Sequence, residues 1–177
     1  GLREATMIVT IFWVFITLII YTYAGYPFLV ALFARTQPKP KFKKAELPKI
    51  TLLISAYNEE AVIAKKIENS LALDYPKDRL QILITADGSN DRTVEIVKGF
   101  TEQGIELTFD PPRRGKMAAI NRAIPLSTGD IIVFSDANNA YSSNALRELA
   151  APFTDPTVAA VSGYKSIVSG DSSPVSY

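Results

Sequence analysis

Three short apolar stretches decide the fold of this chain: ITLLIS at residues 50–55, LQILIT at residues 80–85 and DIIVFS at residues 130–135. Each is rich in Ile, Leu and Val and is apolar on both faces, which is typical of a strand buried beneath helices on both sides. A polar segment follows each stretch: AYNEE, ADGSND and DANN in turn. If the stretches are neighbouring parallel strands, these segments converge at the carboxyl edge of one sheet, where open α/β sheets bind ligands.

Segments with helical periodicity separate the strands. Asn58 is predicted to cap the first helix, in which Ile63, Ile67 and Leu71 fall on one face. This alternation of strand and helix predicts an α/β fold, with a mostly parallel sheet and helices on both faces. The other expected elements are a helix from Asn90 or Asp91 through Val97, a helix that Gly115 opens with an apolar stripe of Met117, Ile120 and Ile124, a helix from Ser142 or Ser143 to about Pro152, and weaker strands at 105–109 and 158–163.

The composition limits the chemistry that the chain can use. It has 177 residues, a formal net charge of +1, no cysteine and no histidine. The near-zero charge gives no reason to expect a nucleic acid partner. Without cysteine and histidine there is no disulfide framework and no histidine base, and a metal must be held by oxygen, which favours Mg²⁺ or Mn²⁺.

The first 36 residues differ in composition from the rest. No charged side chain occurs between Met7 and Ala34, a run longer than the ~20 residues that a helix needs to cross a bilayer core. A buried helix rarely runs so long, and a cleaved signal peptide should be shorter and end in a small-residue site, so a transmembrane helix is favoured. We expect the span to reach about Tyr26, where Gly25 and Pro27 interrupt the run, and to continue along the membrane interface.

Basic residues follow the apolar run, whereas Arg3 alone precedes it. The positive-inside rule therefore places the α/β domain in the cytoplasm. The basic residues, Arg35, Lys39, Lys41, Lys43 and Lys44, belong largely to a proline-containing linker that either lies along anionic membrane lipids or is a solvated connector. The expected organisation is a membrane segment at 1–36, the linker at 37–47 and the α/β domain at 48–177.

The polar segments carry side chains suited to a metal-bound phosphate compound. Asp136 and Asn138 are two residues apart beyond a strand, so their oxygens can face one site, which suits a divalent cation bridging a diphosphate. Asp87 can accept hydrogen bonds from a base or sugar, and Lys116 supplies positive charge for a diphosphate. Each residue alone fits an ordinary turn, loop or solvated position, but their joint placement favours a binding site.

The segments SAYNEE, ADGSND, RRGKMAAINRA and GDIIVFSDANNAY, in this order after an apolar amino terminus, resemble the membrane-anchored, processive-type branch of glycosyltransferase family 2. The resemblance covers about residues 47–165 and implies a GT-A fold with a Rossmann-like nucleotide-binding half. Residue by residue, it implies that Ala56, Tyr57, Asn58 and Glu59 form a nucleotide-contacting loop, that Asp87 holds the nucleobase, that Lys116 lies near the diphosphate, and that Asp136 and Asn138 replace the metal-binding DxD motif.

Two positions depart from the family pattern. The family often has a second aspartate where this chain has Asn138, and an amide oxygen is a weaker metal ligand than a carboxylate. The family also often has an acidic residue where this chain has Ala86.

The reaction that the resemblance implies is transfer of a sugar from a nucleotide-diphosphate sugar to a hydroxyl of a saccharide or lipid-linked acceptor, with inversion and a divalent metal. The family's general base and a QxxRW-like element lie further downstream, and neither occurs before Tyr177. Asp171 fits a loop residue better than a base, so no catalytic residue is assigned. The chain, which lacks an initiator methionine, is expected to be a piece of a longer protein that binds the donor but transfers nothing alone.

The main alternative is a membrane-tethered, non-catalytic module that binds a nucleotide or a regulator, which Asn138 and the missing base favour. A dinucleotide-binding enzyme would carry a GxGxxG turn after the first strand, and AYNEE has no glycine. A P-loop protein would carry a hydroxyl residue after the lysine of RGKMAA.

Overall fold

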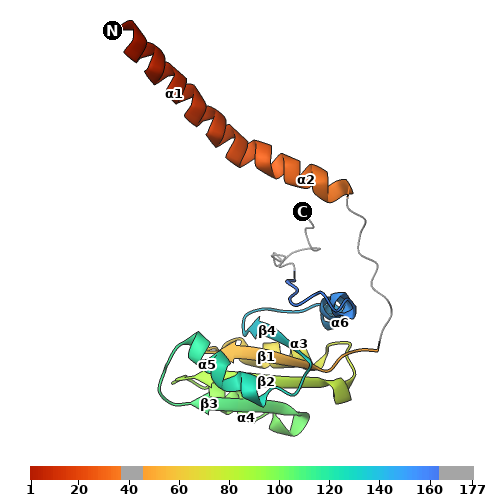
Figure 1. The fold of residues 1–177 in the computed structure, drawn as a ribbon. Helices are drawn as coiled ribbons and strands as arrows, with labels where there is room; N and C mark the ends of the chain where they lie inside the picture. The colour runs from red at the N-terminus through yellow and green to blue at the C-terminus, as the bar shows by residue number, and fades with distance from the viewer. Residues whose placement is uncertain (37–45, 164–177) are drawn as a thin grey trace, which may run out of the picture. The chain divides into compact units, whose positions relative to one another are not determined.

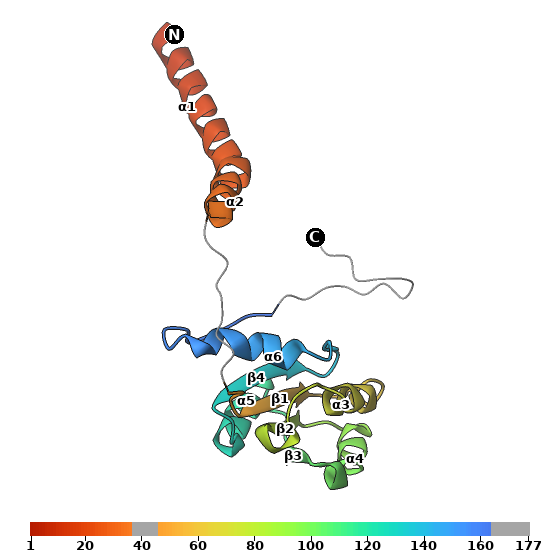
Figure 2. The same cartoon turned by 90° about the vertical axis from the view of Figure 1, so that its right-hand side faces the viewer.

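The computed structural model describes residues 1–36 and 46–163. The chain divides into two compact units, Gly1–Lys41 and Phe42–Tyr177, which Figures 1 and 2 show from two sides. Most of the predicted linker at 37–47, as well as Asp171, lies outside the described residues.

The described residues of the first unit, 1–36, form a continuous helix of mixed geometry. It consists of α1 (Leu2–Ile20), a π-helical turn η1 (Tyr21–Gly25) and α2 (Tyr26–Thr36). Among the described residues it is the one helix that is long and apolar enough to cross a membrane. The helix continues past Tyr26, as the expected interfacial continuation requires, because the π turn accommodates Pro27. Proline has no N–H and clashes with the carbonyl of the preceding turn, and the wider turn, in which Tyr26 N–H donates to Tyr21 O, relieves that conflict.

Among the residues that the structure describes, the second unit is built on a four-stranded parallel sheet in the order β3-β2-β1-β4. The predicted parallel sheet is confirmed, but the strand expected at 158–163 is absent from the structure of those residues. No described strand pairs with this segment, and a strand requires a pairing partner. The strands are β1 (Ile50–Ala56), β2 (Leu80–Asp87), β3 (Ile105–Asp110) and β4 (Ile131–Asp136).

Helices cover both faces of the sheet, as predicted. Figure 2 shows α5 on the opposite side of the sheet from α3 and α4. Short 3₁₀ turns complete the connections: η2 (Lys77–Arg79), η3 (Thr101–Gln103), η4 (Ile124–Leu126) and η5 (Ala151–Thr154). The α-helices are α3 (Ile63–Leu71), α4 (Thr93–Lys98), α5 (Lys116–Ala123) and α6 (Ala145–Ala150).

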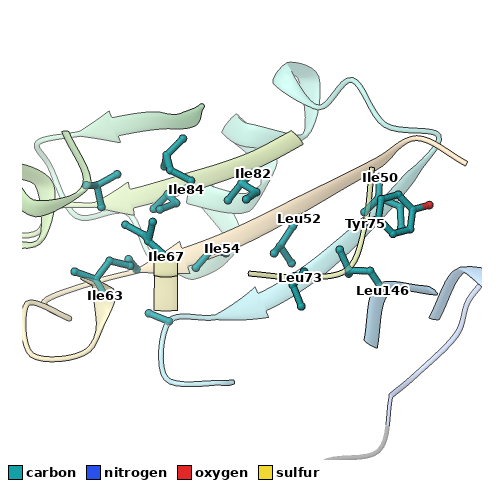
Figure 3. Packing of buried hydrophobic residues seen from close by; sticks show 14 of the residues in the cluster. Ile50, Leu52, Ile54, Ile63, Ile67, Leu73, Tyr75, Ile82, Ile84 and Leu146 are labelled. Carbon is teal, nitrogen blue, oxygen red and sulfur yellow. The ribbon is translucent and has the colours of Figure 1, made fainter. Parts of the chain in front are cut away.

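The core is divided between the two faces of β1. Leu52 and Ile54 pack with Ile63 and Ile67 of α3 on one face, in the larger cluster that Figure 3 shows. Leu53, between them in sequence, packs on the other face with Leu83 and Ala123 in a smaller cluster. Successive side chains of a strand point to opposite faces, so a strand buried on both sides must be apolar throughout.

Helix α5 begins after Gly115 as predicted, but of its predicted apolar stripe only Ile120 packs against the core, whereas Met117 and Ile124 are exposed. Met117 is 66% exposed, whereas Ala119 and Ala123 are at most 1% exposed. The helix lies close enough to the sheet for Thr85 Oγ1 to donate a hydrogen bond to Ala119 O at 3.1 Å. Such a close approach requires small side chains at the contact.

The starts of α4 and α6 are close to the predicted positions. Asp91 Oδ1 accepts a hydrogen bond from Thr93 N–H at 3.0 Å, so Asp91 caps the turn that leads into α4. Asn144, rather than Ser142 or Ser143, occupies the N-cap position of α6. The end of α6 at Ala150, followed by a 3₁₀ turn that contains Pro152, agrees with the prediction.

Gly129 allows the chain to cross the start of β1, and this gives a test of the fold. A Cβ atom at residue 129 would lie 2.4 Å from Thr51 N and 2.6 Å from the Ile50 carbonyl carbon. These backbone atoms cannot move aside as the end of a flexible side chain can. We therefore expect Gly129→Ala to destabilise the domain by about 2 kcal/mol or more. Thermal unfolding of the detergent-solubilised chain measures the effect. Gly163→Ala is the matched control, because its Cβ would make an ordinary 3.5 Å contact with Leu149; equal unfolding midpoints for the two variants would contradict the packing described.

Candidate nucleotide-binding site

The strand register brings three polar loops to one edge of the sheet. Ser55 of β1 pairs with Asp136 of β4, and Ala56 pairs with Ala86 of β2. Because these strands are parallel and end at the same level, the loops after β1, β2 and β4 all leave from the carboxyl edge. The edge predicted to bind a ligand therefore exists, and each predicted residue lies on it or next to it.

Asn58 joins the first loop to the second rather than capping α3. Its Nδ2 donates to Asn90 Oδ1 at 2.8 Å, and its Oδ1 accepts from Asn90 N–H at 3.0 Å. Its backbone N–H donates to Ser89 Oγ at 3.2 Å. The residue has a φ of 52°, a left-handed conformation that asparagine tolerates better than most residues. The predicted N-cap is therefore wrong, because α3 begins at Ile63 and the side chain of Asn58 is used across the loops.

The residues after Asn58 extend this connection between the loops. Glu59 N–H donates to Thr93 Oγ1 at 2.8 Å, and Glu60 N–H donates to Asp91 Oδ2 at 3.1 Å. In the opposite direction, Arg92 N–H donates to Glu60 Oε2 at 3.0 Å. The first two loops are thus fixed to each other by reciprocal hydrogen bonds before any ligand is considered.

Asp87, at the end of β2, is 4% exposed. Its Oδ2 accepts hydrogen bonds from the backbone N–H groups of Arg114 at 3.0 Å and Gly115 at 2.6 Å. Its Oδ1 lies 3.9 Å from Arg122 Nη1 and has no hydrogen-bond partner among the described residues. Asp87 Oδ2 therefore fixes the backbone of the loop before α5, and Asp87 Oδ1 is a buried acceptor that can still take a hydrogen bond.

Tyr57 presents a partly exposed ring beside Asp87. The guanidinium of Arg113 lies 3.8 Å from the centre of that ring, a cation–π contact. Gly88, which has a φ of 66°, permits this arrangement, because a Cβ there would lie 2.6 Å from Arg113 Cβ. Arg113 was not predicted, since nothing in its local sequence indicates the contact with a loop more than fifty residues earlier.

Lys116 and Asp136 meet at the other end of the edge. Lys116 Nζ lies 2.5 Å from Asp136 Oδ1, and Ser55 Oγ donates to the same oxygen at 3.4 Å. Both charged side chains are about half exposed, and such a surface pair contributes about 1 kcal/mol or less to stability. A cavity of about 200 Å³ lies beside them, lined by Leu53, Ser55, Lys116, Ile120, Phe134, Ser135, Asp136 and Asn139.

Asn138 lies in the turn directly after β4 and is exposed. Together with Asp136 and Ser55 it offers a carboxylate, an amide oxygen and a hydroxyl, which are the hard oxygen ligands that Mg²⁺ and Mn²⁺ prefer. The described residues contain no group of three or more acidic, histidine or cysteine side chains that could hold a metal. Ser55, Asp136 and Asn139 line the cavity, whereas Asn138 does not, so a divalent cation here would need further oxygen ligands from a bound diphosphate.

Lys66 is a charged residue of this region that sequence reasoning missed. It lies on α3 and is 3% exposed, and its Nζ donates to Asn139 O at 2.8 Å. Burial lowers the pKa of Lys66 to about 8, although the charge of Asp136 acts to raise it. The helical spacing of Ile63, Lys66, Ile67 and Ser70 places Lys66 on the buried stripe, and this spacing is the signal that could have identified it.

The connection through Asn58 gives a direct test. Asn58→Ala removes both side-chain hydrogen bonds and strains the left-handed backbone, so we expect a loss of about 2 kcal/mol in unfolding free energy. Asn58→Gly keeps the backbone conformation but also removes the hydrogen bonds, and we expect it to lose about half as much. Both variants should speed hydrogen exchange at the Asn90 amide. Unchanged exchange at Asn90 in both would show that the connection is not formed in solution.

Residues 51–175, more than half of the chain, match the sequence profile described as glycosyl transferase family 2. The probable glycosyltransferase YdaM of Bacillus subtilis (strain 168) is 40% identical over 119 residues, which are 64% of this chain and 28% of that protein. A beta-monoglucosyldiacylglycerol synthase of Trichormus variabilis is 33% identical over 150 residues, which are 82% of this chain and 32% of the relative.

A solved structure shows the same fold. The mannosyltransferase PcManGT from Pyrobaculum calidifontis, in complex with GDP-Man and Mn²⁺, superposes with a TM-score of 0.70 at 28% identity, over 78% of this chain and 43% of its own. The chain thus spans less than a third of the curated relatives named above and less than half of this structure. The expected GT-A fold and the resemblance are confirmed. The chain belongs to glycosyl transferase family 2.

Proposed function

We propose that the chain is the donor-binding part of an inverting glycosyltransferase. The enzyme would transfer a sugar from a nucleotide-diphosphate sugar to a hydroxyl of a saccharide or lipid-linked acceptor at the cytoplasmic face of a membrane. The observation that carries this proposal is the convergence of Tyr57, Asp87, Lys116 and Asp136 at the carboxyl edge of one parallel sheet. Such an edge offers stacking, hydrogen-bonding and charged groups to a single elongated ligand.

The end near β2 suits the nucleobase. Asp87 Oδ1 is a buried acceptor that pairs with Arg122 Nη1 at 3.9 Å but has no hydrogen-bond donor among the described residues, and a missing hydrogen bond to a buried acceptor costs about 1–3 kcal/mol. A base N–H that reached this oxygen would recover that cost. The exposed part of the Tyr57 ring would stack on the base, and Ala56 and Glu59 would complete the loop that encloses it.

The end near β4 suits the diphosphate. Asp136 and Asn138 would hold a divalent cation through their oxygens, and Lys116 would supply a further positive charge. When bound, the cation would stabilise the negative charge that develops on the departing diphosphate. The Mn²⁺ in the complex of the related mannosyltransferase supports this assignment. No general base is assigned among the described residues.

The apolar helix at Leu2–Thr36 supports a membrane location. A membrane surface would bring a lipid-linked acceptor to the site, and the name of the glucosyldiacylglycerol synthase relative fits an acceptor of this kind. The basic residues that follow the helix favour a cytoplasmic domain, in contact with anionic lipids.

A non-catalytic, membrane-tethered module remains the second candidate, because one carboxylate and the amide of Asn138 form a weaker metal site than two carboxylates. Calorimetry separates the two functions. Titration of the full chain with UDP and GDP, with and without MnCl₂, should show binding that manganese strengthens if the chain is a donor-binding domain. A chain that binds neither nucleotide under either condition would support the tethered module instead.

Asp136→Ala tests the metal assignment. We expect the variant to lose the manganese-dependent part of nucleotide affinity, by about tenfold or more, while its unfolding midpoint stays close to that of the unaltered chain, because the Lys116 pair is exposed. Glu102→Ala removes an exposed carboxylate of η3 and serves as the matched control. An unchanged manganese effect in Asp136→Ala would remove Asp136 from the metal site.

A further inference from the structure

Helix α3 contacts the loop that carries Asn138 through two polar side chains. Lys66 Nζ donates to Asn139 O at 2.8 Å and lies 4.3 Å from the centre of the Tyr141 ring. Asn69 Nδ2 donates to Tyr141 O at 2.9 Å, and Asn69 Oδ1 accepts from Tyr141 N–H at 2.8 Å. Lys66 and Asn69 are three residues apart, so they lie on the same side of the helix.

The loop has little regular structure of its own. Residues 137–138 form a turn, and residues 139–142 belong to no helix or strand. Within the turn, Asn139 N–H donates to Asp136 O at a long 3.3 Å. The contacts with α3 are therefore the shorter hydrogen bonds to this loop, and they act together with the burial of Ala137 and the packing of Tyr141 in the core.

Burying the charged side chain of Lys66 costs more free energy than burying an apolar side chain, so packing alone does not account for a lysine at this position. An ammonium group removed from water loses hydration that a single carbonyl, an aromatic ring and the nearby charge of Asp136 only partly replace. An apolar side chain of similar length would fill the same space without that cost, and replacing a buried charge by an apolar group often leaves stability unchanged or improves it. The charge of Lys66 is therefore better explained by the hydrogen bond that its ammonium group donates to the backbone of the loop beyond Asp136.

We propose that Lys66 and Asn69 are positioning residues for the metal and diphosphate end of the site. They fix the loop at residues 137–141 so that the side chains of Asp136 and Asn138 can bind the same ligand. This inference rests on the proposed function, since it assigns a role toward the cation and diphosphate. It does not extend to the nucleobase end, which the hydrogen bonds of Asn58 and Asp87 hold independently.

Lys66→Met tests the inference in the full chain, with GDP and UDP as probes in EDTA and in MnCl₂. The metal-free Kd should stay unchanged, because the nucleobase end is intact. The factor by which manganese strengthens binding should fall about tenfold or more, as is typical when residues that orient metal ligands are removed. Lys66→Gln, which retains an N–H donor for Asn139 O, should recover part of the manganese effect. Lys65→Met is the matched control, because Lys65 is the neighbouring, exposed lysine of the same helix.

Two results would overturn the inference while leaving the proposed function intact. One is a manganese effect in Lys66→Met equal to that of the unaltered chain. The other is a parallel loss of metal-free and manganese-dependent affinity, which indicates general structural damage. If Lys66→Met does not fold, Asn69→Ala carries the test with the same expected selective loss. Absence of nucleotide binding by the unaltered chain would overturn both the inference and the proposed function.

Discussion

The parallel pairing of β1 with β2 on one side and β4 on the other is the constraint on which the site depends. It sets Ala56 beside Ala86 and Ser55 beside Asp136, so the loops beyond these residues leave the sheet together. A slip of one residue in either pairing would turn every side chain of a strand to the other face. Because Leu52 and Leu53 are buried on opposite faces, such a slip would disturb both core clusters, and the register is strongly specified.

Some residues of the three loops hydrogen-bond the loops to one another, and others are exposed where a ligand could bind. Asn58 and one oxygen of Asp87 are committed to protein hydrogen bonds, whereas Tyr57, Lys116 and Asn138 keep exposed surface. A site whose framework is hydrogen-bonded in advance loses less conformational entropy when a ligand binds. Asn58, which was predicted to contact the nucleotide, belongs to the first group, because its side-chain amide makes both of its hydrogen bonds with Asn90.

Sequence patterns predicted the strands, the parallel sheet and the edge that carries Asp87 and Asp136, because short apolar runs that end in polar segments are typical of buried parallel strands and the loops that follow them. The patterns failed where contacts cross between distant segments. The apolar stripe of Met117, Ile120 and Ile124 suggested the packed face of α5. Only Ile120 packs against the core, beside Ala119 and Ala123, because the close approach to the sheet favours small side chains at the contact. The spacing of α3 indicates that Lys66 is buried, but its hydrogen bond could not be predicted, since the accepting carbonyl lies 73 residues further along the chain.

The position of β4 at the end of the sheet has a consequence for handling the protein. Among the described strands it pairs with β1 alone, so one row of its backbone N–H and C=O groups faces away from the sheet, and its Phe134 side chain is more than half exposed. An open edge strand with an apolar side chain is a template for adding another strand. Another segment that paired with this row of groups would extend the sheet beyond β4.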